Sequence, residues 1–205
     1  MRDSGKGLVP LFIFAILALS PLSGLAIIFS IAYIGYERRK NKTGDSVFTF
    51  YWDKTKEDIR KYWWLILLPF VSVIGQVVFA YFALPTFHEH VMDRVEPMLH
   101  MGTMFILIPQ LLLLAFGEEL AFRGFAQEKL STILNPKIAI IAVSLLFAVA
   151  HLSTGPAGVV MYDIGFVFID SILYGVLFLK TRNVYITTLA HFLANVIGIY
   201  IFVIM

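Results

Sequence analysis

VYITTLAHFLANVIGIYIFVI, residues 184–204, contains no Asp, Glu, Lys or Arg along its whole length. A helix of about 20 apolar residues spans the hydrocarbon core of a bilayer. His191 and Asn195 interrupt the apolar run, and they are four residues apart. The stretch therefore predicts a membrane-spanning helix that carries two hydrogen-bonding groups on one face.

The composition extends this interpretation to the whole chain. The 205 residues are 59% hydrophobic and 15% charged, with a mean hydropathy of +0.82, whereas soluble domains are about half apolar and about a quarter charged. We expect an all-α, polytopic transmembrane bundle with about six membrane-spanning helices. The expected crossings are residues 8–36 as one helix broken at Pro21, then 63–84, 101–116 with a helical extension to 134, 137–151, 159–179 and 184–204.

The basic residues predict the orientation of these crossings. Residues 37–61 form a polar stretch that we expect to be a solvated loop, and positive loops stay on the cytoplasmic side. This choice places the 85–99 loop outside and both termini outside, although Arg2 and Lys6 favour the opposite side for the N-terminus. It places the remaining basic turns inside, with Lys129, Lys137, Lys180 and Arg182.

Three polar clusters lie within the apolar C-terminal half. They are EELAFR at 118–123, FAVAH at 147–151 and HFLAN at 191–195. An ionisable group in a membrane helix costs at least about 2.5–3.5 kcal/mol, so each is a candidate functional residue. Glu119 and Arg123 are four residues apart and can pair on one helix face.

The three clusters are expected at similar depths. At a rise of about 1.5 Å per residue, Glu118 lies about 16 Å from Lys129, and His151 about 21 Å from Lys137. By the same measure His191 lies about 14 Å from Arg182. The carboxylate, the imidazoles and the amide of Asn195 could therefore meet in one cavity. Asp170, in another apolar run, is expected to face this cavity or to make a helix–helix contact.

Each cluster also has a structural interpretation. Glu119 and Arg123 could form only an ion pair, and a buried histidine is more often a satisfied core residue than a catalyst. His191 and Asn195 could hold helices together through interhelical hydrogen bonds. Each of these explanations is adequate for one cluster. Taken together they do not explain why all three clusters are expected at the same depth, which would then be a coincidence.

The ordered motifs E-E-x-x-x-R, F-x-x-x-H and H-x-x-x-N resemble the signature of the CAAX protease and bacteriocin-processing family (CPBP, or Abi) of intramembrane proteases. The resemblance covers roughly residues 100–200 and implies roles for individual residues. Glu118 and His151 would activate a water molecule against a peptide carbonyl. His191 and Asn195 would stabilise the oxyanion, while Glu119 and Arg123 would give structural support.

The cofactor requirement is left open by the sequence. Glu118, His151 and His191 could bind a divalent metal such as zinc with an open position, yet a glutamate-activated water requires none. The helix motif H-E-x-x-H is absent, and the chain has no cysteine that could ligate a metal or form a disulfide.

The resemblance implies an intramembrane endopeptidase whose partners are the bilayer and a membrane-associated protein or peptide. The formal net charge of +2 is too small to indicate nucleic acid. We expect residues 1–98 to supply membrane anchor helices and the basic loop, residues 99–205 to form the protease core, and the chain to reside as a multi-pass protein in a bacterial plasma membrane. The alternatives are a non-catalytic immunity or scaffold protein of the same family, and a proton-coupled transporter.

Overall fold

The computed structural model describes residues 5–41, 50–100 and 104–204. These residues form an all-α bundle, and no β-strand occurs among them. The elements in chain order are α1 (Gly5–Ala18), α2 (Gly24–Asn41), α3 (Trp52–Ala83), α4 (Phe87–His100), α5 (Met104–Glu119), the π-helix η1 (Leu120–Gln127), α6 (Glu128–Ser131), α7 (Pro136–Ala150), α8 (Ala157–Thr181) and α9 (Val184–Ile204).

Three of the described helices, α3, α8 and α9, are long and apolar enough to cross a membrane. Gly7–Ala18 and Pro136–Ala150 are apolar but shorter. The all-α prediction is confirmed, whereas the prediction of about six crossings is not. The last predicted crossing, 184–204, coincides with α9, and the helical extension of α5 runs through η1 and α6 to Ser131.

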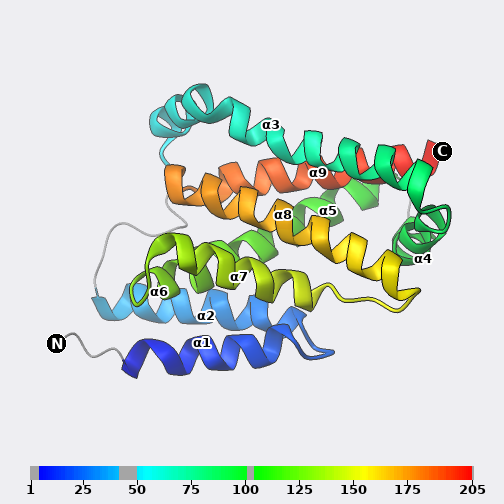
Figure 1. Cartoon of the computed structure of the whole chain (residues 1–205). Coiled ribbons are helices and arrows are strands. Elements are labelled where there is room, and N and C mark those ends of the chain that lie inside the picture. Colours follow the sequence, from blue (N-terminus) through cyan, green and yellow to red (C-terminus); the bar gives the residue numbers. More distant parts are fainter. Residues whose placement is uncertain (1–4, 42–49, 101–103, 205) are drawn as a thin grey trace.

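The predicted single helix over residues 8–36 is wrong, because the chain reverses between α1 and α2. Ser20 makes the turn by donating its hydroxyl to the carbonyl of Leu17 at 2.8 Å, while its Oγ accepts from the amide of Leu22 at 3.1 Å. The two helices run side by side as a hairpin (Figure 1). Phe14 of α1 packs edge-on against Phe122 and Phe125 of η1, so the hairpin supports η1.

The reversal places the start of α1 and the end of α2 at the same end of the bundle (Figure 1), and the membrane side of the N-terminus stays a prediction. The start of α1 lies beside the turn before α7, since a Cβ at Gly7 would be 3.3 Å from Ile133. That turn belongs to what we call the basic end of the bundle, where α2 finishes, α3 begins, and the α6–α7 and α8–α9 connections lie (Figure 1). The opposite end, here the far end, holds α4 and the end of α9, whereas the α1–α2 turn lies between the two ends, near the level at which α7 ends.

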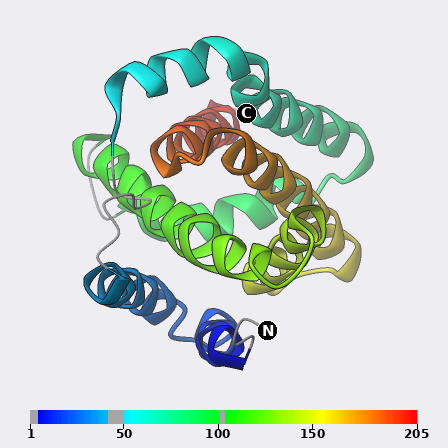
Figure 2. The same ribbon diagram turned by 90° about the vertical axis from the view of Figure 1, so that its left-hand side faces the viewer.

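Two segments predicted as loops are largely helical. Within residues 37–61, α2 continues to Asn41 and α3 begins at Trp52, while residues 42–49 lie outside the described part. Tyr62 has non-helical dihedrals (φ −116°, ψ 19°), and the turns of α3 before it cross the basic end at an angle to the rest of α3 (Figure 2).

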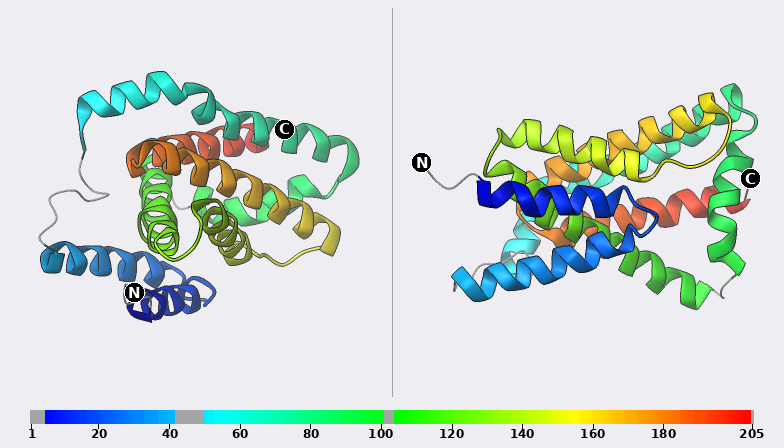
Figure 3. Two further views of the ribbon diagram at one scale, coloured as in Figure 1. Left: turned by 60° about the vertical axis from the view of Figure 1, so that its left-hand side comes forward. Right: turned by 90° about the horizontal axis from the view of Figure 1, so that it is seen from below.

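The predicted 85–99 loop is the helix α4. It lies across the far end of the bundle (Figure 3). Phe87 is buried against Tyr162 and Phe202, and the His88 ring bonds the carbonyl of Phe202 at 2.8 Å. Packing of this apolar edge stabilises a helix whose charged composition is typical of a loop.

Candidate active site

The π-helix η1 carries the first polar cluster into the interior. Glu119 ends α5, and all eight residues of η1 are buried. Single π-helical turns within α-helices often occur at functional sites. Arg123 Nη1 lies 3.3 Å from Glu119 Oε1, and neither side chain is more than 1% exposed. The predicted Glu119–Arg123 pair therefore forms, although the π-helical turn is wider than an α-helical one.

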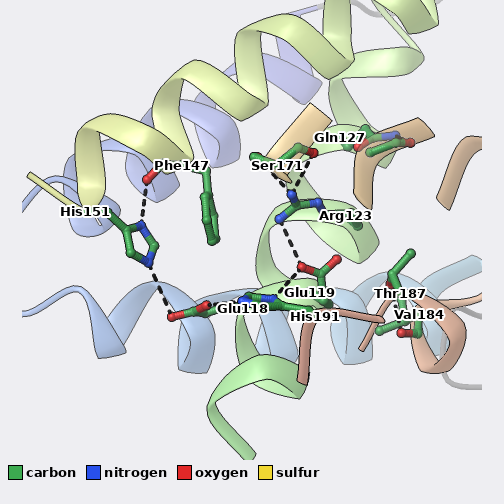
Figure 4. Close-up of polar contacts among 11 residues, drawn as sticks. Glu118, Glu119, Arg123, Gln127, Phe147, His151, Ser171, Val184, Thr187 and His191 are labelled. Carbon is green, nitrogen blue, oxygen red and sulfur yellow. Dashed lines mark hydrogen bonds and ion pairs between the residues drawn. The ribbon is translucent and has the colours of Figure 1, made fainter. Parts of the chain in front are cut away.

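Arg123 also joins η1 to α8. Its Nη2 donates to the backbone oxygen of Ser171 at 2.9 Å and to the Ser171 hydroxyl at 2.8 Å (Figure 4). The guanidinium lies over the rings of Phe147 and Tyr174, at 4.9 and 5.5 Å from their centroids. The buried charge is thus held by a carboxylate, two oxygen acceptors and two aromatic faces.

His151 sits at the C-cap of α7, where the helix ends midway along the bundle. Its Nδ1 donates to the carbonyl of Phe147, one turn earlier, at 2.8 Å. A carbonyl can only accept, so the proton lies on Nδ1 and a neutral His151 presents a lone pair at Nε2. That Nε2 is 3.8 Å from Glu118 Oε1 (Figure 4).

His191 approaches Glu118 from α9. Its Nδ1 donates to Glu119 Oε1 at 2.9 Å, and its Nε2 is 3.7 Å from Glu118 Oε2. The ring stacks on Tyr174, with centroids 4.7 Å apart and planes at 19°. One imidazole therefore lies between both carboxylates of the E-E pair.

The geometry leaves a small space around Glu118. Its two oxygens are each nearer 4 Å than 3 Å from a histidine nitrogen, which is too long for a direct hydrogen bond. The carboxylate and the Nε2 lone pair of His151 are both acceptors. A small molecule with two donor groups, such as water, could bridge them.

The predicted residues line one cavity of about 320 Å³. Glu118, His151, His191 and Asn195 all contribute to its wall. Glu118 and His151 are about one quarter exposed, so solvent-sized molecules can reach them. Asp170 also lines the cavity, as the sequence led us to expect.

Several other lining residues were not predicted. These are Gln76 of α3, Arg94 of α4, and Asp163 and Tyr174 of α8. A signal existed in part, because Asp163, Asp170 and Tyr174 are seven and four residues apart and therefore share one face of a helix. No signal marked Arg94, since α4 was predicted as a loop.

The donor types at Glu118, His151 and His191 suit a divalent metal, but their placement does not form a metal centre. Among the residues that the structure describes, no group of three or more His, Asp or Glu side chains is arranged to hold an ion. Both histidines use Nδ1 for second contacts, as metal-bound histidines commonly do. A hydrolytic site can also be formed by these side chains and water alone.

The family comparison provides an independent observation. The model of the family described as type II CAAX prenyl endopeptidase Rce1-like matches residues 100–197. Residues 100–197 belong to the Rce1-like family. This family is the CPBP (Abi) family that the three motifs indicated. Searches of curated proteins and of solved structures found no significant match.

The matched domain indicates a broad class of protein. The Rce1-like domain contains all three polar clusters and is that of a membrane endopeptidase family. Together with the long apolar helices, it makes the chain an integral membrane protein. Gln76 and Val73 of α3, which precede the Rce1-like domain, also line its cavity. The boundary between residues 98 and 99 stays a prediction.

Proposed function

We propose that the chain is an intramembrane endopeptidase that hydrolyses a peptide bond of a membrane-associated protein or peptide. The proposal depends most on one observation: Glu118 lies in a cavity within 4 Å of two imidazole nitrogens from two other helices. Family membership supports peptide-bond hydrolysis at the level of the class.

In this mechanism Glu118 and His151 activate a water molecule held between them. Glu118 accepts a proton as the water oxygen attacks the peptide carbonyl carbon, and His151 Nε2 accepts a hydrogen bond from the same water. Collapse of the tetrahedral intermediate returns the proton to the leaving amine. General acid–base catalysis of this kind contributes about 10²–10⁴-fold to a rate.

His191 and Asn195 stabilise the developing oxyanion, the role that is often the largest electrostatic contribution. Asn195 follows His191 by one turn of α9, and its amide can donate into the cavity. His191 can donate from Nε2 only when both nitrogens carry protons, because Nδ1 is bound to Glu119. Glu119 and Arg123 keep the ring and η1 in place.

Replacement of Glu118 by Gln tests the proposal, because the amide keeps the volume and cannot accept the proton. We expect a loss of cleavage of about 10²-fold or more, with normal accumulation in the membrane. The measurement compares the termini of membrane peptides from cells carrying the intact chain, Glu118→Gln, or the control Glu89→Gln on the exposed face of α4. Full biological activity of Glu118→Gln with unchanged peptide termini would instead support the immunity or scaffold function.

A mechanism without a metal also predicts the response to chelation. Activity of the purified chain in bilayer nanodiscs should survive exhaustive removal of divalent ions, and added zinc should not raise it. Metal analysis of the intact chain, His151→Ala and His191→Ala should give the same low content. Loss of activity on chelation that zinc restores would contradict this mechanism and support metal-dependent hydrolysis.

The basic end is placed on the cytoplasmic side of a bacterial plasma membrane in this proposal. The support is the concentration of Lys and Arg in the connections at that end.

A further inference from the structure

Asp170 is a carboxylate of the cavity that the mechanism above does not use. It lies on α8, four residues before Tyr174, so the two side chains share a face of the helix. Tyr174 stacks on His191, and both Asp170 and Tyr174 line the cavity. One turn of helix corresponds to about 6 Å, which places Asp170 within reach of a side chain beside the reacting bond.

The other acidic groups of the cavity have partners. Asp163 pairs with Arg94 of α4, and Glu118 faces two histidines. Asp170 differs: its neighbours are the Ser72 hydroxyl and the His191 ring. Its Oδ1 is buried, and within the described residues it has neither a hydrogen-bond donor nor a Lys or Arg partner.

An unpaired carboxylate in a membrane cavity is costly, and it pairs favourably with a cation that enters the same cavity. Glu118 adds a second carboxylate to the wall, and Arg94, the one Lys or Arg side chain among the described lining residues, is already paired with Asp163. The field of the cavity therefore favours a positively charged group of the substrate over a neutral or negative one.

We propose that Asp170 determines specificity by binding a basic side chain, Lys or Arg, within one or two residues of the cleaved peptide bond. This inference rests on the proposed function, because it names the substrate class of that same site. A lysine side chain is long enough to reach the Asp170 carboxylate from a peptide whose carbonyl lies between Glu118 and His191. Apolar residues on either side of the basic one would suit the rest of the wall, which includes Val73, Leu111 and Val167.

The test uses the full chain in nanodiscs and three internally quenched peptides. The peptides have identical apolar flanks and differ at one position beside the expected cleavage site, which is Lys, norleucine or Glu. We expect kcat/KM for the Lys peptide to exceed that for the norleucine peptide by about tenfold or more, because a desolvated ion pair discriminates at least this strongly. The Glu peptide should be cleaved most slowly.

Substitution at Asp170 then assigns the preference. In Asp170→Asn the ratio of Lys to norleucine cleavage should fall to about one, and Asp170→Glu should restore most of it. Asp93→Asn, the same change on the exposed face of α4, should keep the ratio of the intact chain. An unchanged ratio in Asp170→Asn would overturn the inference and would leave Asp170 as a helix–helix contact to Ser72.

A binding measurement separates this inference from the proposed function. Glu118→Gln should bind a fluorescent Lys peptide more tightly than the norleucine peptide, and adding Asp170→Asn should remove the difference. Charge-dependent binding without cleavage by the intact chain would contradict the proposed function and retain the inference. Cleavage of all three peptides at equal rates would retain the proposed function and reject the role of Asp170.

Discussion

At the scale of single residues, the Glu119–Arg123 pair explains how charges persist inside the bundle. Both side chains are almost fully buried, and Arg123 has further acceptors on Ser171. A buried ion pair adds little net stability compared with apolar residues, but losing one partner leaves an uncompensated charge. The pair is therefore important for holding His191, which bonds the same Glu119 oxygen.

Removing Arg123 should destabilise the fold more than removing the whole pair. We expect Arg123→Met to lower the free energy of unfolding by about 3–5 kcal/mol, because Glu119 is left buried and unpaired. The double variant Glu119→Gln, Arg123→Met should recover part of that loss. Unfolding in mixed detergent micelles measures both, with Arg39→Met on the exposed end of α2 as the control. Equal stability of the single and double variants would contradict this account.

Most residues of the candidate site could be predicted from the sequence, whereas the residues that contact them could not. Counting residues from the basic turns placed Glu118, His151 and His191 at one depth, and the structure has them in one cavity. Ser171 and Tyr174 lie in an apolar run where a serine or tyrosine is unremarkable. Their contacts with Arg123 and His191 follow from how α8 packs on η1 and on α9, which no local pattern specifies.

At the scale of elements, η1, α7 and α8 approach one another closely at Gly175. Gln127 of η1 donates its side-chain amide to the Gly175 carbonyl at 2.9 Å. A Cβ on Gly175 would lie 2.9 Å from Ile140 Cγ2 and 3.0 Å from Gln127 Oε1. The absence of a side chain here lets α8 come near enough for Ser171, one turn earlier, to reach Arg123.

An alanine at Gly175 should therefore lower stability relative to an alanine elsewhere in α8. Gly165 is the matched control, since a Cβ there would have nothing within 4 Å. The helix propensity of alanine favours both variants by about 1 kcal/mol, but overpacking at Gly175 costs about 1–3 kcal/mol. Thermal unfolding in the same detergent should show Gly175→Ala less stable than Gly165→Ala, and the reverse order would refute the close approach.

The elements that sequence patterns missed share a physical cause. Residues 8–36 are nearly continuously apolar, so hydropathy alone cannot distinguish one kinked helix from a hairpin. In the structure the hydroxyl of Ser20 makes two hydrogen bonds that stabilise the turn of the hairpin. The helix α4 has a polar sequence, and its stability comes from tertiary contacts of Phe87. Where tertiary packing determines the element, local composition is misleading.

At the scale of the whole molecule, the α1–α2 hairpin brings the N-terminal end of α1 to the basic end. Salt links at this end connect elements distant in sequence, with Lys129 bound to Glu37 of α2 and Arg182 bound to Glu128 of α6. The hairpin is thus attached to the Rce1-like domain by charge as well as by aromatic packing.

This arrangement predicts which positions share a side of the membrane. The chain has no native cysteine, so single-cysteine variants can be labelled directly with a membrane-impermeant maleimide in intact cells and in lysed cells. Gly7→Cys at the start of α1 and Thr132→Cys in the α6–α7 connection should label only after lysis, and Thr154→Cys in the α7–α8 connection should label in intact cells. Labelling of Gly7→Cys in intact cells would contradict the hairpin, because a single crossing over residues 8–36 would place Gly7 on the side opposite to the end of α2.

The wide turn of η1 has a consequence for protein engineering. A π-helical stretch shifts the angular phase of everything after it, as one extra residue in a regular helix would. Copying E-E-x-x-x-R and the residues after it onto an ordinary α-helical scaffold would keep the Glu–Arg pair on one face but would rotate the downstream glutamine away from its acceptor. A graft that transfers the chemistry must therefore also transfer the irregular backbone.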